Sequence, residues 1–274
     1  MAREPVLGGQ RSAAKEKLRI VESDRELTVL LKWTSPAEVV ALRAASSVPR
    51  TTAIPRLIQS GRDSRGDWIA VPFYTGEPAR TETTIPDNVM DSLAAVHAHY
   101  LNSAPLGAIP VRDGTWWKAR CAQPRLRQLG RPSLQPIIEV VQSWSSHRLI
   151  VEALTELPRT LLHGDVHRNN VVVSNHTGRL IDWGGAAYRL PQLDVITPGP
   201  LGSRGFERYA SAWQALTGES TAGASWQRGY LAATVCNKVD YLGFVARNFG
   251  DDAARARFET AARALSELER SDGQ

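Results

Sequence analysis

Residues 161–173 read Leu-Leu-His-Gly-Asp-Val-His-Arg-Asn-Asn-Val-Val-Val, and residues 180–183 read Leu-Ile-Asp-Trp. The first stretch ends in three valines, the second begins with an apolar pair, and turn-forming residues lie between them. This pattern predicts a β-hairpin. A loop that carries Asp165 and Asn170 enters the first strand and Asp182 ends the second, so the hairpin should bring these side chains together.

The polar side chains of this hairpin suit the chemistry of phosphoryl transfer. Mg²⁺ prefers hard oxygen ligands, and proteins usually hold it with one or two carboxylates together with substrate phosphates and water. Asn170 and Asp182 therefore suit a magnesium ion, which leaves Asp165 for the hydroxyl that accepts the phosphoryl group. A single His-Gly-Asp is a common accident, but a matched set of polar positions framed by two apolar strands is not.

Residues 163–170, His-Gly-Asp-Val-His-Arg-Asn-Asn, followed by Ile-Asp-Trp, resemble the aminoglycoside phosphotransferase and choline kinase-like family of small-molecule kinases. The resemblance implies an α+β, protein-kinase-like fold with two lobes. The N-terminal lobe would be an antiparallel sheet plus a helix, and the C-terminal lobe would be mostly α-helical with a catalytic hairpin. It also implies that Asp165 is catalytic, and that Asn170 and Asp182 act in catalysis by holding the metal.

Three further residues are candidates for supporting the catalytic loop. We expect His163 to be a buried, orienting residue and His167 to hold the loop. Asp194, within Leu-Asp-Val at 193–195, resembles the aspartate that supports the catalytic loop from behind in this family. A helix cap is an equally good interpretation of Asp194.

The sequence departs from the family pattern at three places. Asn169 stands where the family has a glycine, and because asparagine also tolerates positive φ, the loop should keep its shape. Gly184 follows the Asp-Trp pair where an acidic residue is common. Residues 189–191 read Arg-Leu-Pro where the family has Gly-Asp-Pro. These departures concern substrate contacts more than the chemistry.

A lysine near the end of a β-rich apolar run, residues 27–33, is the candidate phosphate-binding residue of the first lobe. A lysine in a buried strand is costly unless it is paired, and Lys32 resembles the strand lysine that holds the α- and β-phosphates of ATP. Residues 35–38, Ser-Pro-Ala-Glu, predict a helix start with an N-cap and a proline in the first turn. Glu38 is the expected partner of Lys32; complementing the helix dipole is its alternative role.

Two further segments resemble nucleotide-binding positions of the family. Gly9, in a Gly-Gly pair, stands where a short glycine-containing loop covers the phosphates, although an ordinary turn has the same composition. Downstream, the resemblance implies that Val71 lines the adenine pocket, that the carbonyl of Pro72 accepts from the adenine amine, and that the amide of Tyr74 donates. A proline is compatible with this role because it lacks only the backbone N–H donor and keeps the carbonyl acceptor. An edge strand with a proline would show the same pattern.

Length and composition fit a two-lobed chain. A sequence of 274 residues with 42% hydrophobic residues can bury a sizeable core. We expect residues 1–76 to form the nucleotide-binding lobe, with a hinge near 71–76, and residues 77–274 to form the catalytic and acceptor-binding lobe. Helical patterns recur downstream, at 206–216, 226–249 and 252–268.

Several functional classes are excluded by composition. No stretch approaches the roughly 20 apolar residues of a membrane span, and the N-terminus has no apolar signal segment. Cys121 and Cys236 stand far apart, which indicates neither a disulfide framework nor a zinc site. The basic residues are scattered, which does not indicate nucleic-acid binding. We expect a cytoplasmic protein without a membrane or nucleic-acid partner, as a monomer or a homodimer.

Charge bears on the identity of the acceptor. The net charge is +5; residues 1–76 contribute +4 (12 basic, 8 acidic), residues 77–157 zero (8 and 8) and residues 158–274 +1 (13 and 12). A site built for a polycation such as an aminoglycoside should concentrate carboxylates. The sequence instead favours a neutral or weakly charged hydroxyl compound, such as a nucleoside, macrolide, peptide or sugar-bearing natural product.

The expected function is transfer of the γ-phosphate of ATP, with Mg²⁺, to a hydroxyl of a small molecule, most simply an antibiotic or related natural product. The sequence does not choose between ATP and GTP. A metabolic kinase for choline, ethanolamine, homoserine or a sugar is the main alternative, and a nucleotide-binding pseudokinase is a third. Weaker candidates for acceptor contacts are Trp116, Trp117, Trp226, Tyr230, Tyr241, Asn237, Lys238 and Asp240.

Overall fold

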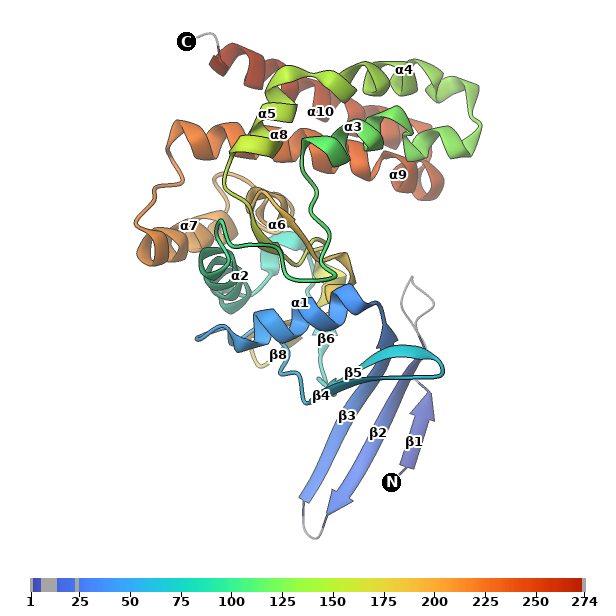
Figure 1. Ribbon diagram of the computed structural model, residues 1–274, viewed down its shortest axis with the longest axis vertical. Coiled ribbons are helices and arrows are strands. Elements are labelled where there is room, and N and C mark those ends of the chain that lie inside the picture. Colours follow the sequence, from blue (N-terminus) through green and yellow to red (C-terminus); the bar gives the residue numbers. More distant parts are fainter. Residues whose placement is uncertain (1, 6–13, 23–24, 273–274) are drawn as a thin grey trace.

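The computed structural model describes residues 2–5, 14–22 and 25–272, and it places a sheet at one end and a group of helices at the other (Figure 1). The sheet has the order β1-β2-β3-β5-β4, and every neighbouring pair in it is antiparallel. Its strands are β1 (Ala2–Pro5), β2 (Lys15–Glu22), β3 (Arg25–Thr34), β4 (Gln59–Asp63) and β5 (Gly66–Pro72). An antiparallel sheet with one helix, α1 (Pro36–Ser47), inserted between β3 and β4 confirms the architecture expected for the first lobe.

The start of α1 fixes its position relative to the central strand β3. Ser35 is the N-cap, its side chain accepts from the backbone N–H of Glu38 at 3.3 Å, and Pro36 occupies the first turn. Only Ser35 separates the helix from β3, so the first turn of α1 lies beside the end of that strand. This short connection brings Glu38 within reach of Lys32.

The predicted hairpin is present and carries a third strand. β8 (Val171–Ser174) pairs with β9 (Thr177–Leu180) and also with β6 (Glu77–Pro78). The turn is tighter than expected, because only Asn175 and His176 lie between the strands, with φ of 48° and 63°. Two consecutive residues with positive φ are typical of the turns that fit a twisted two-stranded hairpin.

The chain crosses between the two ends of the molecule at Gly76. Its φ is +154°, and a Cβ there would lie 2.3 Å from the carbonyl oxygen of Val173, so the crossing needs glycine. The division into lobes at residue 76 stays a prediction. The first hydrophobic core extends across it, since Leu42 of α1 belongs to the same buried cluster as Leu93 and Val171.

The remainder is mostly helical, as predicted, and a second buried core lies among part of its helices. Its α-helices are α2 (Asp87–His99), α3 (Gly114–Ala122), α4 (Gln135–Ser143), α5 (Arg148–Glu156), α6 (Gln192–Val195), α7 (Arg204–Thr217), α8 (Ala224–Asp240), α9 (Leu242–Phe249) and α10 (Asp251–Asp272). Short 3₁₀ helices are η1 (Glu82–Thr84), η2 (Arg125–Leu129), η3 (Pro132–Leu134), η4 (Trp144–Ser146), η5 (Arg168–Asn170) and η6 (Trp183–Gly185), and β7 (Thr160–Leu162) pairs with β10 (Ala187–Arg189).

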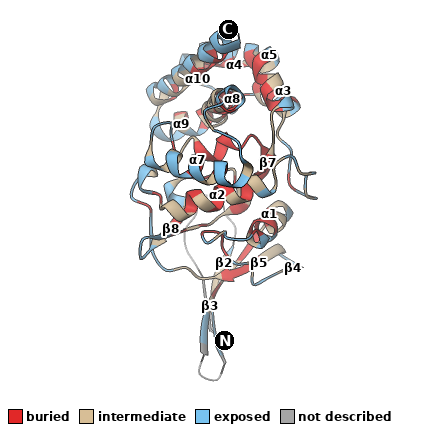
Figure 2. Ribbon diagram, turned by 90° about the vertical axis from the view of Figure 1, so that its left-hand side faces the viewer, coloured by how far each residue is buried: buried red, intermediate tan, exposed pale blue. Residues whose placement is uncertain are grey.

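The helical pattern predicted over residues 226–249 is confirmed, with one break at Tyr241 that divides it into α8 and α9. Periodicity does not show this break, and Tyr241 contacts the catalytic loop there, as described below. Figure 2 shows buried residues concentrated among α2, β7 and α8, and exposed ones along the outer faces of α7 and α10. Among the described helices, none is long and apolar enough to cross a bilayer.

Candidate active site

Lys32 and Glu38 form a buried ion pair at the junction of β3 and α1. The Lys32 ammonium donates to both Glu38 oxygens, at 2.7 and 2.8 Å, and the two residues are only 7% and 2% exposed. The hydroxyl of Thr34 also donates to Glu38. Such a pair is costly to bury unless its hydrogen bonds are satisfied, and here both partners have them. The contact confirms the pairing expected from the sequence.

The same lysine reaches Asp182, which lies 150 positions further along the chain. Its ammonium donates to Asp182 Oδ1 at 2.8 Å, which joins the first lobe to the end of the hairpin. Asp182 has φ +66°, a conformation that is uncommon outside glycine and occurs at functional sites. Burial raises the pKa of Asp182, but the charge and hydrogen bond of Lys32 lower it further, so its net pKa lies below the usual range.

Asp165 and Asn170 face each other across the catalytic loop. The Asn170 amide donates to the backbone carbonyl of Asp165 at 2.9 Å and approaches its carboxylate at 3.5 Å. The tolerance of asparagine for positive φ, which was expected to preserve the loop, is not used at Asn169: this residue lies in η5 and is not among the described residues with positive φ. A 3₁₀ turn needs no glycine, which explains why the substitution leaves the loop intact.

Two side chains hold the Asp165 carboxylate. The Tyr241 hydroxyl donates to Oδ1 at 2.9 Å, and His167 Nε2 lies 3.7 Å from Oδ2. Burial raises the pKa of Asp165, but its contacts with His167 and Tyr241 lower it further, to about 2. Reciprocally, contact with Asp165 raises the pKa of His167, and burial followed by the Asp165 charge raises that of Tyr241. Asp165 is therefore ionised throughout the neutral range.

The backbone of the catalytic loop is held from behind by Asp194 of α6. Its two oxygens accept from the backbone N–H groups of His163 at 2.7 Å and Gly164 at 2.8 Å, while His97 Nε2 donates to it at 3.3 Å. His163 is fully buried and donates from Nε2 to the carbonyl of Ile181 at 2.9 Å, which ties the loop to the end of the hairpin. The contacts of Asp194 are those of a loop support rather than of a helix cap.

A cavity between the sheet and the hairpin gathers the predicted nucleotide-binding side chains. Its lining includes Lys32, Glu38, Val71, Pro72, Tyr74, Asn170 and Asp182. Val71 is 6% exposed and contributes an apolar wall. The predicted roles of the Pro72 carbonyl and the Tyr74 amide stay predictions. Gly9 lies outside the described residues.

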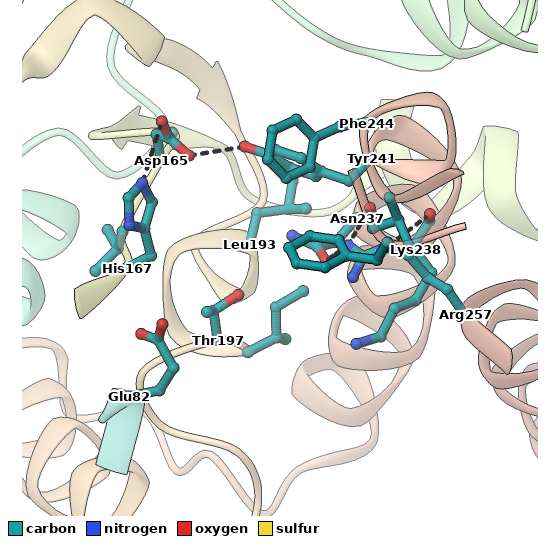
Figure 3. A pocket seen from close by; sticks show the side chains of 15 residues that line it. Glu82, Asp165, His167, Leu193, Thr197, Asn237, Lys238, Tyr241, Phe244 and Arg257 are labelled. Carbon is teal, nitrogen blue, oxygen red and sulfur yellow. Dashed lines mark hydrogen bonds and ion pairs between the residues drawn. The ribbon is translucent and has the colours of Figure 1, made fainter. Parts of the chain in front are cut away.

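A second cavity lies on the other side of the catalytic loop and contains Asp165 but not Asp182 (Figure 3). Asp165, His167 and Glu82 lie on one side of it in the view, and Asn237, Lys238 and Arg257 lie on the other. We call it the Asp165 cavity. Of the weaker aromatic candidates, Tyr241 belongs to its lining and the others do not, and Trp117 is fully buried in the second core instead.

Comparison with known proteins identifies the family. The profile of the phosphotransferase enzyme family matches residues 30–242, which include Lys32, the whole catalytic loop and Asp182. The chain belongs to the phosphotransferase enzyme family. This family membership confirms the prediction from the motif that the chain is a small-molecule phosphotransferase.

Solved structures share the fold of this phosphotransferase at low sequence identity. Choline kinase from Cryptosporidium parvum Iowa II has a TM-score of 0.64 and 14% identity, over 99% of this chain and 90% of the other. Aminoglycoside 2'-phosphotransferase-IIIa, as a GDP complex, has a TM-score of 0.52 and 15% identity, over 97% and 93%. A thermostable mutant of the aminoglycoside phosphotransferase APH(4)-Ia, in a ternary complex with ADP and hygromycin B, has a TM-score of 0.51 and 14% identity, over 98% and 94%. Among curated proteins, none matches the sequence significantly.

The sequence did not point to Glu82 as part of the candidate site, and it gave Tyr241 little weight. Glu82 lines the Asp165 cavity and its Oε2 accepts from the backbone N–H of Arg168 at 2.8 Å. Tyr241 contacts Asp165 directly, although the sequence made it only one of several weak aromatic candidates. No local signal identifies either one, since Glu82 begins a single 3₁₀ turn and Tyr241 lies in an apolar helical pattern.

Replacing Lys32 of the phosphotransferase with methionine should destabilise the fold by about 3–5 kcal/mol. The change leaves the Glu38 carboxylate, 2% exposed, without its cationic partner. Chemical denaturation should show the loss, and the double variant Lys32→Met/Glu38→Leu should recover most of it. A single variant as stable as the wild type would show that the pair does not hold β3 to α1.

Removing the Tyr241 hydroxyl should raise the pKa of Asp165 from about 2 toward the ordinary value of 3.8. Because the folded-state pKa is lowered, the stabilisation by ionised Asp165 is complete above the unfolded pKa and is lost as pH falls through about 2. In Tyr241→Phe, the stabilisation by ionised Asp165 should therefore be smaller, and it should be lost at a higher pH than in the wild type. Carbon-13 NMR titration of the aspartate carboxyls measures the shift, and an unchanged titration would contradict the assigned contact.

Proposed function

We propose that this chain transfers the γ-phosphate of ATP to a hydroxyl of a small molecule, with Asp165 as the catalytic carboxylate. The observation that carries the proposal is the position of the catalytic loop between two cavities. Asn170 and Asp182 line the cavity that contains Lys32, and Asp165 lines the other. A donor and an acceptor bound in these cavities would meet at the loop, and such positioning supplies most of the rate in phosphoryl transfer.

The residues present fit a magnesium ion held jointly with a nucleotide. Among the described residues, no cluster of three or more His, Cys, Asp or Glu side chains could hold a metal alone. Asn170 and Asp182 instead offer an amide oxygen and a carboxylate in one cavity, the few protein ligands that Mg²⁺ takes when phosphates and water complete its shell. Mg²⁺ bound there would neutralise charge on the β- and γ-phosphates.

The protein side chains then have distinct tasks in the proposed reaction. Lys32, held in place by Glu38, binds the α- and β-phosphates. Asp165 accepts a hydrogen bond from the acceptor hydroxyl and takes its proton as the oxygen attacks the γ-phosphorus, while the bond from that phosphorus to the β,γ-bridging oxygen breaks and ADP leaves. The Tyr241 hydroxyl fixes Asp165 Oδ1 at 2.9 Å, and the side chains of Asn170 and His167 approach Oδ2 at 3.5 and 3.7 Å. His163, through the carbonyl of Ile181, keeps the loop in register with the hairpin.

The charges of the Asp165 cavity support an acceptor that is not a polycation. Its acidic side chains are Glu82 and Asp165, its basic ones are Lys238 and Arg257, and His167 lies beside Asp165. A polycation would meet as many fixed positive as negative charges there. We therefore propose an antibiotic or related natural product of low positive charge. A metabolic hydroxyl compound is the second candidate, because the balanced charges suit it equally.

The test is a screen for nucleotide-dependent phosphorylation of hydroxyl compounds. Purified protein with Mg²⁺ and either ATP or GTP is incubated with antibiotics, nucleosides, choline, homoserine and sugars. ADP or GDP release is coupled to a spectrophotometric signal, and mass spectrometry identifies the phosphorylated product. Phosphorylation of a low-charge natural product supports the proposal. Aminoglycosides as the preferred substrates would contradict the acceptor class, and nucleotide binding without transfer to any acceptor would favour a pseudokinase.

A further inference from the structure

Lys238 of α8 is a cation without a carboxylate partner in the Asp165 cavity. Within the described part of the chain, its ammonium makes no hydrogen bond or ion pair. Asp240, the nearest acidic residue in sequence, is already bound to Arg120, whose Nε donates to it at 2.7 Å. Glu82 and Asp165 lie on the opposite side of the cavity in Figure 3. A half-buried cation without an ionic partner is unfavourable unless a ligand supplies a negative charge to pair with it.

The neighbouring Arg257 does not offer a second unpaired cation, because its guanidinium is already hydrogen-bonded. Its Nε donates to the carbonyl of Lys238 at 3.0 Å, and its Nη2 donates to the carbonyl and side chain of Asn237 at 3.0 and 2.8 Å. It therefore caps the end of α8 and leans over the Tyr241 ring at 5.6 Å. Burial, followed by repulsion from Arg257, lowers the pKa of Lys238, an effect that a bound anion would oppose.

An apolar surface lies beside this cation. Phe244 and Phe249 of α9 line the same cavity, are 41% and 67% exposed, and pack edge to face with ring centres 6.1 Å apart. Exposed aromatic side chains grouped at a cavity indicate a binding surface. The cavity thus offers a carboxylate at Asp165, a cation at Lys238 and an aromatic wall.

We propose that Lys238 binds an anionic group of the acceptor, a carboxylate or a phosphate, whose ring or apolar body packs on Phe244 and Phe249. The acceptor class is then an amphiphilic hydroxyl compound with at least one negative charge. The inference rests on the proposed function for the position of the hydroxyl at Asp165. The anion and the aromatic wall rest only on the contents of the cavity.

The experiment measures binding rather than turnover, with the nucleotide cavity saturated by AMP-PNP and Mg²⁺. Isothermal titration compares para-(hydroxymethyl)benzoate, its neutral amide and the corresponding phenyl phosphate, and then uridine with uridine monophosphate. We expect the anionic members to bind about tenfold to a hundredfold more tightly than the neutral ones, which is the range of one charge-assisted hydrogen bond. The carboxylate and phosphate arms decide which anion fits.

Lys238→Met should remove this preference, and Lys118→Met is the matched control. Lys118 is an exposed residue of α3, so its replacement removes the same charge without touching the cavity. Equal binding of neutral and anionic probes by the wild type, no binding of any probe, or a preference that survives in Lys238→Met would each overturn the inference.

Failure of the proposed function gives a different result. Asp165→Asn should bind the anionic probes at least as tightly as the wild type, since it leaves Lys238 in place and removes a negative charge. If the wild type phosphorylates no acceptor but shows a charge preference that depends on Lys238, the proposed reaction is wrong and the anion site stands. If it phosphorylates neutral acceptors with no such preference, the reaction stands and the anion site is wrong.

Discussion

Asp165→Asn should lower kcat by about a thousandfold, while the affinity for nucleotide stays within a factor of about two of the wild-type value. Asparagine keeps the shape of the side chain and can still accept from Tyr241, which donates to Asp165 at 2.9 Å in the wild type. It cannot take a proton from the acceptor hydroxyl. Asp165 is absent from the lining of the cavity between the sheet and the hairpin, where the nucleotide is proposed to bind, so nucleotide contacts should persist. Steady-state kinetics and nucleotide titration measure the two quantities separately.

The control for this variant is Asp252→Asn, an exposed change on α10 that alters the net charge equally. Circular dichroism and thermal unfolding should show that Asp165→Asn is folded, with a modest loss of stability because its carboxylate is favourably placed in the native state. Wild-type kcat in Asp165→Asn would show that another group takes the proton. A loss of nucleotide binding to the same extent as kcat would show that the two cavities are not separate.

Asp182→Asn should lower kcat by at least about a hundredfold and raise the concentration of Mg²⁺ that gives half-maximal rate. The carboxylate is the only charged oxygen ligand that we propose for the metal, and the amide that replaces it is a weaker one. Lys32 keeps its two bonds to Glu38, so the junction of β3 and α1 should survive. Rates measured across a range of Mg²⁺ separate weaker metal binding from a slower reaction.

A matched comparison for Asp182→Asn is Lys32→Met/Glu38→Leu, which removes the phosphate-binding lysine but leaves the proposed metal ligands. That variant should raise the KM for nucleotide and leave the dependence on Mg²⁺ nearly unchanged. If Asp182→Asn has the Mg²⁺ dependence of the wild type, Asp182 does not hold the metal. Its role would then be limited to the contact with Lys32 at 2.8 Å.

The parts of the site that could be predicted from the sequence are local in the chain. The hairpin follows from apolar runs on both sides of a turn, and the pairing of Lys32 with Glu38 follows from a strand that ends one residue before an N-capped helix. In each case a short connection fixes the geometry before any tertiary packing is considered. The α+β, two-lobed architecture followed from the resemblance carried by the same residues.

Two parts that escaped prediction depend on contacts between distant segments. The Tyr241 hydroxyl reaches Asp165 from the residue after α8, and nothing in the apolar pattern around Tyr241 marks the end of that helix. Glu82 joins the candidate site because it binds the backbone of Arg168 on the catalytic loop. The loop itself was expected to keep its shape because asparagine tolerates positive φ, whereas the structure forms a 3₁₀ turn at Asn169.

We propose that Asp165 takes the proton of a hydroxyl as that hydroxyl receives the phosphoryl group of a bound nucleotide. The most direct test incubates the wild type and Asp165→Asn with γ-labelled ATP, Mg²⁺ and the best acceptor from the screen, and follows the label by chromatography. We expect a labelled phosphate ester with the wild type and at most about a thousandth of that rate with the variant. Transfer at equal rates by both proteins, or release of inorganic phosphate alone by both, would contradict the proposal.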